Sequence, residues 1–218
     1  MGKSLKLIIF DLDGTLINAY KAVELSVNFT MQKLDLPSQS KDTIRRSVGW
    51  GDRNLLERFV KPSELAKALK IYRRHHSKAL KIGTKFLPGA KKLLEKLYSE
   101  KYLLAVASNR PTKFSLIALN HLKVQKYFAY ILCADKLRQG KPHPEILNQI
   151  LSKLNVLRSE ALYVGDMTID VETGNNAGIK TVAVLTGSSS LGEIKKRKPF
   201  KIIRKISKLT SIINNLNT

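Results

Sequence analysis

Two aspartates stand one residue apart directly after the apolar run Leu7–Phe10. Asp11 and Asp13 are followed at once by a Gly-Thr pair that is typical of a turn. In an extended segment, side chains at positions i and i+2 leave on the same side, so we expect the two carboxylates to converge on one small volume. Two carboxylates about 4 Å apart repel by roughly 4 kcal/mol at an effective dielectric near 20. The pattern therefore predicts that a later part of the chain supplies positive charge.

Such a pair suits chemistry at phosphorus. A carboxylate can attack a phosphoryl group and form an aspartyl-phosphate, which splits one difficult displacement into two easier ones. The second carboxylate can then transfer protons. Gly14 permits a tight turn that brings backbone N–H groups near a phosphate, and Thr15 adds a hydroxyl. Taken alone, the motif fits equally well a strand end followed by an acidic turn.

Three later segments place polar side chains at the ends of apolar runs. Ser108 and Asn109 follow one run and offer short hydrogen-bond donors. Lys141 lies in a loop bounded by glycine and proline, where an ammonium group can neutralise the aspartates and a phosphate. Asp166 and Asp170 follow another run and suit Mg²⁺, a hard cation that takes oxygen ligands. Each signal is weak by itself, but strands of one parallel sheet bind ligands at their carboxyl ends.

Strand-length apolar runs alternate with helix-period segments along most of the chain. This alternation predicts an α/β fold with a parallel sheet wrapped by helices. Helices are expected to begin near residue 90, after a Pro-Gly pair, and near Pro144. The predicted strands are Leu5–Phe10, Tyr102–Ala107, Tyr130–Cys133, Ala161–Val164 and Thr181–Leu185.

The region from about residue 17 to residue 84 breaks the alternation, because it contains helical segments and no convincing strand. We interpret it as a small all-helical domain inserted after the first strand. The predicted division is a core of residues 1–16 and 85–218 and a cap of residues 17–84. The final basic segment is expected to form a short strand at 201–204 and then a helix, rather than one amphipathic helix on a membrane surface.

The charge of the chain is strongly positive: 39 Lys and Arg residues against 17 Asp and Glu residues give a net charge of +22. Such a field attracts polyanions, so nucleic acid is a possible partner. The basic residues are spread along the whole chain, however, and the one tight run is Lys195–Lys201. We therefore expect no nucleic-acid partner, no membrane partner and a cytoplasmic location. The single cysteine, Cys133, is expected to be a small buried hydrophobe.

Together, the four polar motifs resemble those of the haloacid dehalogenase superfamily. The matching residues, in the order of the family's motifs, are Asp11-Leu12-Asp13-Gly14-Thr15, Ser108, Lys141, and Gly165-Asp166 with Asp170. The segments VGWGDRNLLERF and NNAGIKTVAVLTG further resemble phosphoglycolate phosphatase-like members. The resemblance implies a Rossmann-like three-layer core with an inserted helical cap, in a monomer or a homodimer that hydrolyses a small phosphorylated metabolite.

The resemblance also implies a role for each matching residue. Asp11 would be the nucleophile and Asp13 the acid and base. Mg²⁺ would be held by the Asp11 carboxylate, the Asp13 carbonyl and Asp166, with Asp170 binding it directly or through a neighbour. Lys141 would hold the transferred phosphoryl group and complete the catalytic set. The expected substrate-binding residues are Thr15, Ser108, Asn109, Trp50 and Arg53, the last two from the cap.

Two other functions stay open at this point. A sugar phosphomutase similar to β-phosphoglucomutase would use the same motifs, although SNRP after the second motif resembles the phosphatase pattern more closely. A basic nucleic-acid-binding protein without catalysis is the more remote alternative. Dehalogenation is not expected, because relatives with that activity lack an aspartate at the position of Asp13. His75 and His76 are expected to face solvent on a basic helix.

Overall fold

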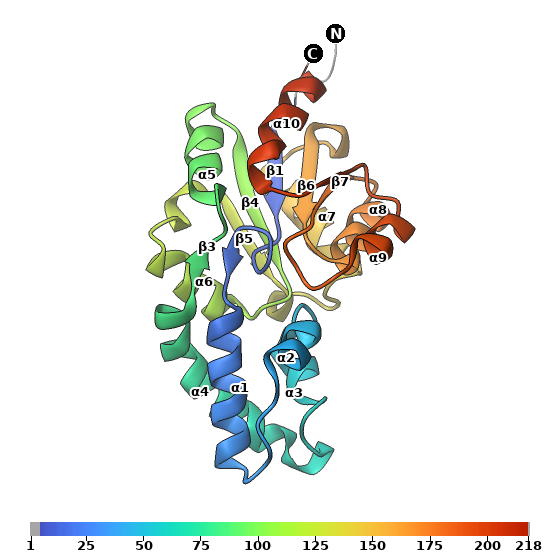
Figure 1. Ribbon diagram of the computed structural model, residues 1–218. Coiled ribbons are helices and arrows are strands. Elements are labelled where there is room, and N and C mark those ends of the chain that lie inside the picture. The colour runs from blue at the N-terminus through green and yellow to red at the C-terminus, as the bar shows by residue number, and fades with distance from the viewer. Residues whose placement is uncertain (1–4, 218) are drawn as a thin grey trace.

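A six-stranded parallel sheet forms the centre of residues 5–217, the part of the chain that the computed structural model describes (Figure 1). The strands run in the order β5-β4-β1-β6-β7-β8 across the sheet. Their bounds are β1 (Leu7–Phe10), β4 (Leu103–Ser108), β5 (Tyr130–Cys133), β6 (Ala161–Gly165), β7 (Lys180–Val184) and β8 (Lys201–Ile203). The α/β fold expected from the sequence is confirmed, including the short strand near residue 201.

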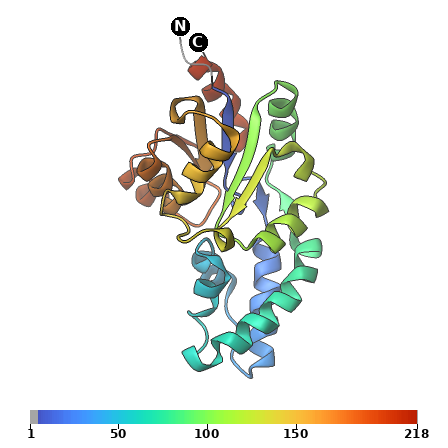
Figure 2. The same ribbon diagram turned by 180° about the vertical axis from the view of Figure 1, so that it is seen from behind.

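Both faces of the sheet are covered, as the two opposite views in Figures 1 and 2 show. Leu7 and Ile9 of β1 point into one apolar cluster, and Ile8 and Phe10 point into the other, as the period of two along a strand requires. The first cluster is covered by α7 (Glu145–Leu154) and the end of α8 (Thr168–Ala177). The second is covered by α5 (Ala90–Ser99), α6 (Thr112–His121) and α10 (Leu209–Asn217).

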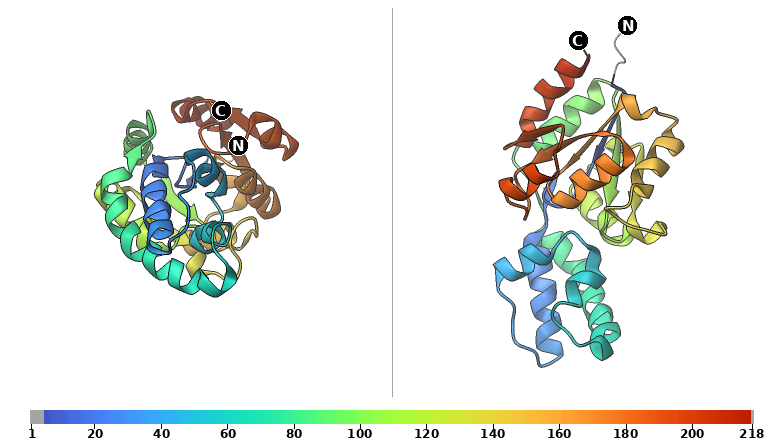
Figure 3. Two further views of the ribbon diagram at one scale, coloured as in Figure 1. Left: turned by 60° about the horizontal axis from the view of Figure 1, so that its bottom comes forward. Right: turned by 90° about the vertical axis from the view of Figure 1, so that its right-hand side faces the viewer.

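The helices α1–α4, here called the cap helices, lie together beyond one edge of the sheet (Figure 3, right). They are α1 (Tyr20–Lys33), α2 (Lys41–Ser47), α3 (Gly51–Leu56) and α4 (Leu65–Gly83). They share an apolar cluster of their own, which includes Val27, Leu56 and Tyr72. The predicted boundaries between core and cap stay a prediction, and residues 1–4 and 218 of the predicted core lie outside the described residues.

A two-stranded antiparallel ribbon joins the cap helices to the sheet. Its strands are β2 (Ile17–Asn18) and β3 (Lys85–Phe86), which pair Ile17 with Phe86. Neither strand was predicted, because a segment of two residues is too short to show a periodic pattern. The chain enters the cap helices through β2 and leaves them through β3. Because these two strands are paired, the first and last residues of the cap region lie side by side.

His76 does not face solvent as the sequence analysis expected. Its side chain is 2% exposed, stacks on Tyr72 and meets the edge of Phe114 from α6. The physical reason is that α4 packs against both α1 and α6, so its buried face is wider than that of a helix with one neighbour. Burial, followed by the charge of Arg110, lowers the pKa of His76 to about 3, and the imidazole is therefore neutral at physiological pH. The side chain of the neighbouring His75 is partly exposed.

Cys133 is buried, as expected, and carries no disulfide. The loop after β7 leads into α9 (Leu191–Lys196). Ser190 caps this helix by accepting a hydrogen bond from the Glu193 backbone N–H. No helix within residues 5–217 is long and apolar enough to cross a membrane.

Leu97 tests the packing of α5 on the sheet. Its side chain is 0% exposed within the sheet cluster, so Leu97→Ala should lower the free energy of unfolding by about 2–5 kcal/mol. Lys92→Ala on the exposed face of the same helix should change it by less than about 0.5 kcal/mol. Urea unfolding of both variants measures the difference, and equal losses would contradict the packing described here.

Candidate active site

The carboxyl ends of β1, β4 and β6 are adjacent in the sheet, and they bring the sequence motifs to one place. The Asp11 backbone N–H donates to the Val164 carbonyl at 2.8 Å, which fixes the end of β1 beside the end of β6. A cavity of about 60 Å³ lies between this edge and the cap helices. Asp11, Asp13, Ser108, Asn109, Lys141 and Asp170 line it from the core side.

Lys141 lies between two of the predicted carboxylates. Its Nζ is 2.6 Å from Asp11 Oδ1 and 2.6 Å from Asp170 Oδ1, and the Lys141 side chain is 2% exposed. Burial alone would lower the pKa of Lys141, but the two carboxylates raise it well above its ordinary value. The ammonium group is therefore charged. It supplies positive charge from a later part of the chain, as the Asp11-Asp13 pair predicted.

Both carboxylate oxygens of Asp170 accept hydrogen bonds from other residues of the protein. Oδ1 accepts from Lys141 Nζ and from the Tyr163 hydroxyl at 2.7 Å. Oδ2 accepts from the backbone N–H groups of Asp166 at 3.1 Å and Met167 at 3.0 Å, which shapes the turn into α8. Asp170 is therefore better placed to orient Lys141 and Asp166 than to act as a free ligand. Tyr163 was not predicted as a site residue, because a single tyrosine in an apolar strand is typical of the hydrophobic core.

Asp11, Asp166 and Asp170 place carboxylate oxygens within 4.8 Å of one another. Asp166 Oδ1 accepts a hydrogen bond from the Thr15 hydroxyl at 2.7 Å, whereas Oδ2 is buried without a partner among the described residues. Burial and the charges of Asp11 and Asp170 raise the pKa of Asp166 well above its ordinary value. A buried, oxygen-only and electron-rich cluster of this kind fits a hard divalent cation.

Two glycines leave room for the Asp166 carboxylate. Gly14 has a φ of +86°, which favours glycine, and a Cβ there would overlap the Asp166 carboxylate. A Cβ at Gly187, in the loop between β7 and α9, would overlap the same carboxylate. The site residues predicted from the sequence do not include Gly187, because a glycine in a loop carries no sign of its contact with the acidic cluster.

The same loop also contacts the cap. The Thr186 hydroxyl donates to the Gly14 carbonyl, which ties the loop to the first motif. Arg45 of α2 donates from Nη2 to the carbonyls of Thr186 and Gly187, each at 3.2 Å. The β7–α9 loop therefore touches the acidic cluster on one side and the cap on the other.

Asp13 has a separate partner, Arg110, which the site residues predicted from sequence do not include. Arg110 Nη2 lies 2.6 Å from Asp13 Oδ1, and both side chains are largely buried. Burial raises the pKa of Asp13, while the charges of Arg110 and Lys141 act in the opposite direction. The signal that could have found Arg110 was its position in the SNRP segment, directly after the second motif.

Ser108 and Asn109 hold the loop that carries this arginine. The Ser108 hydroxyl oxygen accepts from the Arg110 backbone N–H at 3.1 Å, so its own hydrogen can still be donated into the cavity. Asn109 accepts from the Lys141 backbone N–H at 2.9 Å and donates to the Gly49 carbonyl of the cap at 3.1 Å. One amide side chain therefore joins the second motif, the third motif and the cap.

The structure places the other predicted substrate residues differently. The Thr15 hydroxyl donates to Asp166, and Thr15 does not line the cavity. Trp50 is 37% exposed and borders a neighbouring cleft with Ser189, and Arg53 forms an ion pair with Glu57 at 2.9 Å. The cap side of the cavity is formed instead by Val23, Val48, Gly49, Gly51, Asp52, Leu55, Tyr72 and His76.

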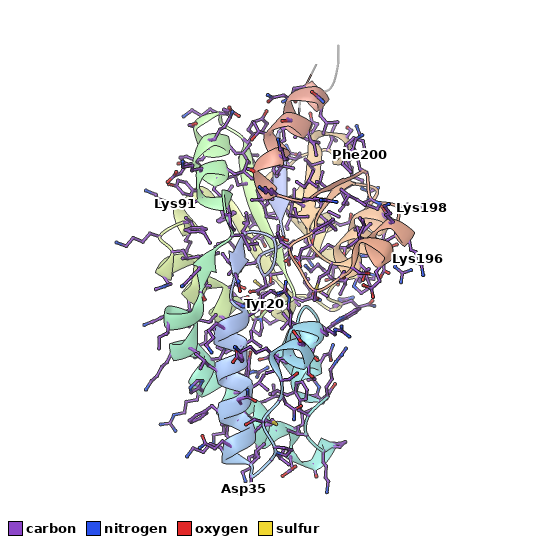
Figure 4. All side chains as sticks on the ribbon, in the orientation of Figure 1. Tyr20, Asp35, Lys91, Lys196, Lys198 and Phe200 are labelled. Atoms are coloured by element: carbon purple, nitrogen blue, oxygen red, sulfur yellow. The ribbon has the colours of Figure 1, made fainter. Side chains whose placement is uncertain are left out.

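Tyr20 stands where the cap meets the sheet edge (Figure 4). Its hydroxyl is buried without a partner among residues 5–217, and its ring stacks under the Arg45 guanidinium at 4.8 Å. Burial and the nearby charges of Asp166 and Asp13 raise the pKa of this hydroxyl, which therefore stays protonated. Sequence reasoning missed Tyr20, because a tyrosine near the start of a helix carries no distinctive spacing.

Comparison with known proteins agrees with this geometry. Residues 8–184 match the haloacid dehalogenase-like hydrolase family. Phosphoglycolate phosphatase of Aquifex aeolicus is 34% identical over 183 residues, which cover 84% of this chain and 86% of that enzyme. Phosphoglycolate phosphatase of Pasteurella multocida is 30% identical over 220 residues, which cover 95% and 98% of the two chains. The crystal structure of a predicted phosphoglycolate phosphatase from Haemophilus somnus has a TM-score of 0.90 at 27% identity, covering 95% and 97%.

The chain therefore belongs to the haloacid dehalogenase-like hydrolases, and the resemblance found in its motifs is confirmed. Within this family it is a phosphatase-type enzyme that is similar to phosphoglycolate phosphatases in sequence and in fold.

The acidic cluster predicts how a divalent cation should stabilise the protein. Without a cation, burial raises the pKa of Asp11 from 3.8 to about 6 and also raises that of Asp166 well above its ordinary value. The folded protein then binds more protons than the unfolded chain, so the stability that Asp11 contributes is present below about pH 4 and is lost as the pH rises through about 6. A divalent cation that replaces those protons should therefore stabilise the fold more at pH 7.5 than at pH 5.

Thermal unfolding with and without Mg²⁺ at the two pH values measures this effect. We expect a rise in Tm of a few degrees at pH 7.5 and a smaller one at pH 5. Asp166→Asn should abolish most of the rise. An equal rise at both pH values, or an unchanged rise in the variant, would show that the cation binds elsewhere.

Proposed function

We propose that the protein is a Mg²⁺-dependent phosphatase that hydrolyses a small phosphomonoester through an aspartyl-phosphate, in the manner of a phosphoglycolate phosphatase. The observation that carries the proposal is the Asp11 carboxylate, which lines the cavity between the sheet edge and the cap helices while Lys141 Nζ holds its Oδ1 at 2.6 Å. The family and the phosphatase names of the relatives support the reaction type. Phosphoryl transfer needs positioning and charge stabilisation, both of which this cluster of side chains can supply.

The cation site would be formed by Asp11 and Asp166, with the Asp13 backbone carbonyl as a further oxygen. The buried Asp166 Oδ2, which has no partner among residues 5–217, is the strongest support for a cation here. Asp170 would contribute by holding the Asp166 backbone N–H and Lys141 rather than by offering a free oxygen. When bound, Mg²⁺ neutralises charge on the phosphoryl oxygens.

In the first step, Asp11 attacks phosphorus and the bond between phosphorus and the ester oxygen breaks. Lys141 and the Ser108 hydroxyl hold the phosphoryl oxygens, since both line the cavity beside Asp11. Asp13 gives its proton to the departing oxygen, which leaves as an alcohol. The burial that raises the pKa of Asp13 helps it to carry that proton.

In the second step, Asp13 accepts a proton from water as the water oxygen attacks phosphorus. The aspartyl-phosphate bond breaks, which restores the Asp11 carboxylate and releases inorganic phosphate. The cap residues exclude bulk water from the first step, because Val48, Leu55 and Tyr72 cover the cavity on the side away from the sheet.

We propose a cytoplasmic enzyme, monomeric or homodimeric, that binds a small phosphorylated metabolite and neither a membrane nor nucleic acid. The cavity between cap and sheet, with a volume of about 60 Å³, supports a small ligand rather than a polyanion. We also propose that residues 17–84 move as a lid relative to the core.

Asp11→Asn should abolish hydrolysis, since the amide cannot form the intermediate. We expect at least about a 1,000-fold loss of phosphate release from phosphoglycolate in the presence of Mg²⁺. The matched control is Asp35→Asn, the same chemical change at an exposed residue at the far end of the cap, which should leave activity unchanged (Figure 4). Undiminished turnover by the Asp11 variant would refute the mechanism.

The same assays separate the other functions. Conversion of a sugar 1-phosphate to its 6-phosphate without free phosphate would indicate a phosphomutase. Tight, strongly salt-dependent binding of nucleic acid, unaffected by Asp11→Asn and without any phosphate release, would indicate a binding protein.

Asp13→Asn should separate the two steps when p-nitrophenyl phosphate is the substrate. Nitrophenolate is a good leaving group and needs no proton, so the first step should continue. The second step lacks its base and should slow by about 100-fold or more. We therefore expect a burst of close to one nitrophenolate per protein and a phosphorylated Asp11, detected by mass spectrometry. Steady turnover at the wild-type rate without a burst would show that Asp13 plays no such role.

A further inference from the structure

The Tyr20 side chain carries its hydroxyl into the protein, at the junction of the cap helices and the sheet (Figure 4). The residue is partly exposed, but its hydroxyl oxygen is buried and has no hydrogen-bond partner among residues 5–217. A tyrosine near a protein surface usually places its ring inside and its hydroxyl in water. A buried hydroxyl without a partner costs free energy, because its bonds to water are lost and not replaced. The reversed arrangement therefore indicates a partner that arrives with a ligand.

Contacts from the cap and from the β7–α9 loop hold this tyrosine in place. The Tyr20 backbone N–H donates to Asn18 Oδ1 at 3.1 Å, which fixes the first residue of α1. The Arg45 guanidinium covers the ring, with its central carbon 4.8 Å from the ring centre. Arg45 is itself bonded to the carbonyls of Thr186 and Gly187. These contacts keep the hydroxyl directed inward.

The start of α1 lies next to the turn that contacts Asp166. The Gly14 backbone N–H donates to the Ile17 carbonyl at 2.8 Å, so the chain turns back sharply just before α1 begins. Gly14 and Gly187 both lie against the Asp166 carboxylate. Burial raises the pKa of the Tyr20 hydroxyl, and among the neighbouring charges that of Asp166 raises it most. The hydroxyl therefore lies on the Asp166 side of the acidic cluster.

Asp166 Oδ2 and the Tyr20 hydroxyl are two buried groups that do not bond to each other. Neither has a hydrogen-bond partner among the described residues. The carboxylate oxygen can bind a cation directly, and the hydroxyl can accept as well as donate. A water molecule carried by a cation has its oxygen on the cation and its hydrogens directed outward. A cation with such a water would therefore give both groups a partner.

The partner of Tyr20 is not part of the ester. Lys141 and Ser108, which would hold the phosphoryl group, line the cavity, whereas Tyr20 is not among the residues that line it. Val23 lies one turn further along the same face of α1 and does line the cavity. Tyr20 therefore lies beside the space for the substrate, toward the β7–α9 loop. Mg²⁺ usually binds few protein oxygens and keeps several waters, which suits this position.

We infer that Tyr20 is a positioning residue of the cation site, and that its hydroxyl accepts a hydrogen bond from a water molecule that the cation carries beside Asp166. A cation makes its bound water more acidic and thus a stronger donor, so this bond is stronger than one between two neutral groups. The inference rests on the proposed Mg²⁺-dependent phosphatase and adds to it a residue that contacts neither the ester nor the protein carboxylates.

Tyr20→Phe removes the hydroxyl and keeps the ring under Arg45. Calorimetric titration with Mg²⁺ alone at pH 7.5 should show about 10-fold weaker binding than in wild type. Without a cation, the variant should unfold at the same temperature as wild type or higher, because the lost hydroxyl has no partner in the protein. In saturating Mg²⁺ its Tm should rise by less than that of wild type. Tyr98→Phe is the matched control, since Tyr98 is 50% exposed on α5, and it should change none of these quantities.

Kinetics with phosphoglycolate separate the cation from the ester. In Tyr20→Phe, the Mg²⁺ concentration for half-maximal activity should rise about as much as the dissociation constant, while KM for the ester at saturating Mg²⁺ should not change. Unchanged Mg²⁺ binding would overturn the inference. A raised KM at saturating Mg²⁺ would assign the hydroxyl to the phosphoryl group, and a lower Tm without a cation would assign it to the fold; either result would also overturn it. If wild-type protein neither binds Mg²⁺ nor releases phosphate from any phosphomonoester, the proposed function fails instead.

Discussion

The site depends on one buried ion cluster, in which the Lys141 ammonium group is shared between Asp11 and Asp170. The three side chains are 2%, 10% and 2% exposed, so their charges are almost fully removed from water. Such burial costs several kcal/mol per ion unless each charge has close partners. Here both ion pairs are 2.6 Å long, and Asp170 gains further hydrogen bonds from Tyr163 and from the backbone. With Asp13 and Asp166, the described cluster holds two more carboxylates than it has cations once Arg110 is counted. Burial raises the pKa values of Asp11 and Asp166, the neighbouring negative charges raise them further, and both effects favour a divalent cation.

The parallel sheet is what allows residues far apart in the chain to form this cluster. Neighbouring strands lie about 4.8 Å apart, so the ends of β4, β1 and β6 occupy one short stretch of sheet edge. Each crossover helix carries the chain back to the start of the next strand, so every strand ends at this same edge, and the cap helices follow the first of these strand ends. The turn that carries Asp11 and Asp13 therefore also leads into the cap helices. Asn109 reinforces this coupling, because its amide bonds both the Lys141 backbone and the Gly49 carbonyl.

The sequence predicted the framework well and the interior of the site less well. Apolar runs located the strands to within about two residues, because strands that are covered on both faces, such as β1 and β6, are buried throughout and therefore show as continuous apolar runs. Asp11, Lys141 and Asp170 could be placed together because polar residues at strand ends must share one edge. Tyr163, Arg110 and Gly187 act through contacts across the fold, which no local pattern records. His76 was misassigned for a related reason: its burial depends on α6, which is distant in sequence and contributes Phe114 to the contact. Trp50 and Arg53 were expected at the substrate, whereas the cavity is lined by their neighbours Gly49, Gly51, Asp52 and Leu55.

The β7–α9 loop connects the acidic cluster with the cap. Gly187 lies against the Asp166 carboxylate, and the carbonyls of Thr186 and Gly187 accept hydrogen bonds from Arg45 of the cap. In the proposed enzyme, in which a cation binds beside Asp166 and the cap moves as a lid, a ligand that shifts Asp166 would also shift the surface on which the cap closes. Thermodynamic linkage makes such an effect reciprocal: if an occupied cation site favours the closed cap, then the closed cap raises the affinity for the cation by the same factor. Occupancy of the acidic cluster and closure of the proposed lid would then form a single cooperative equilibrium.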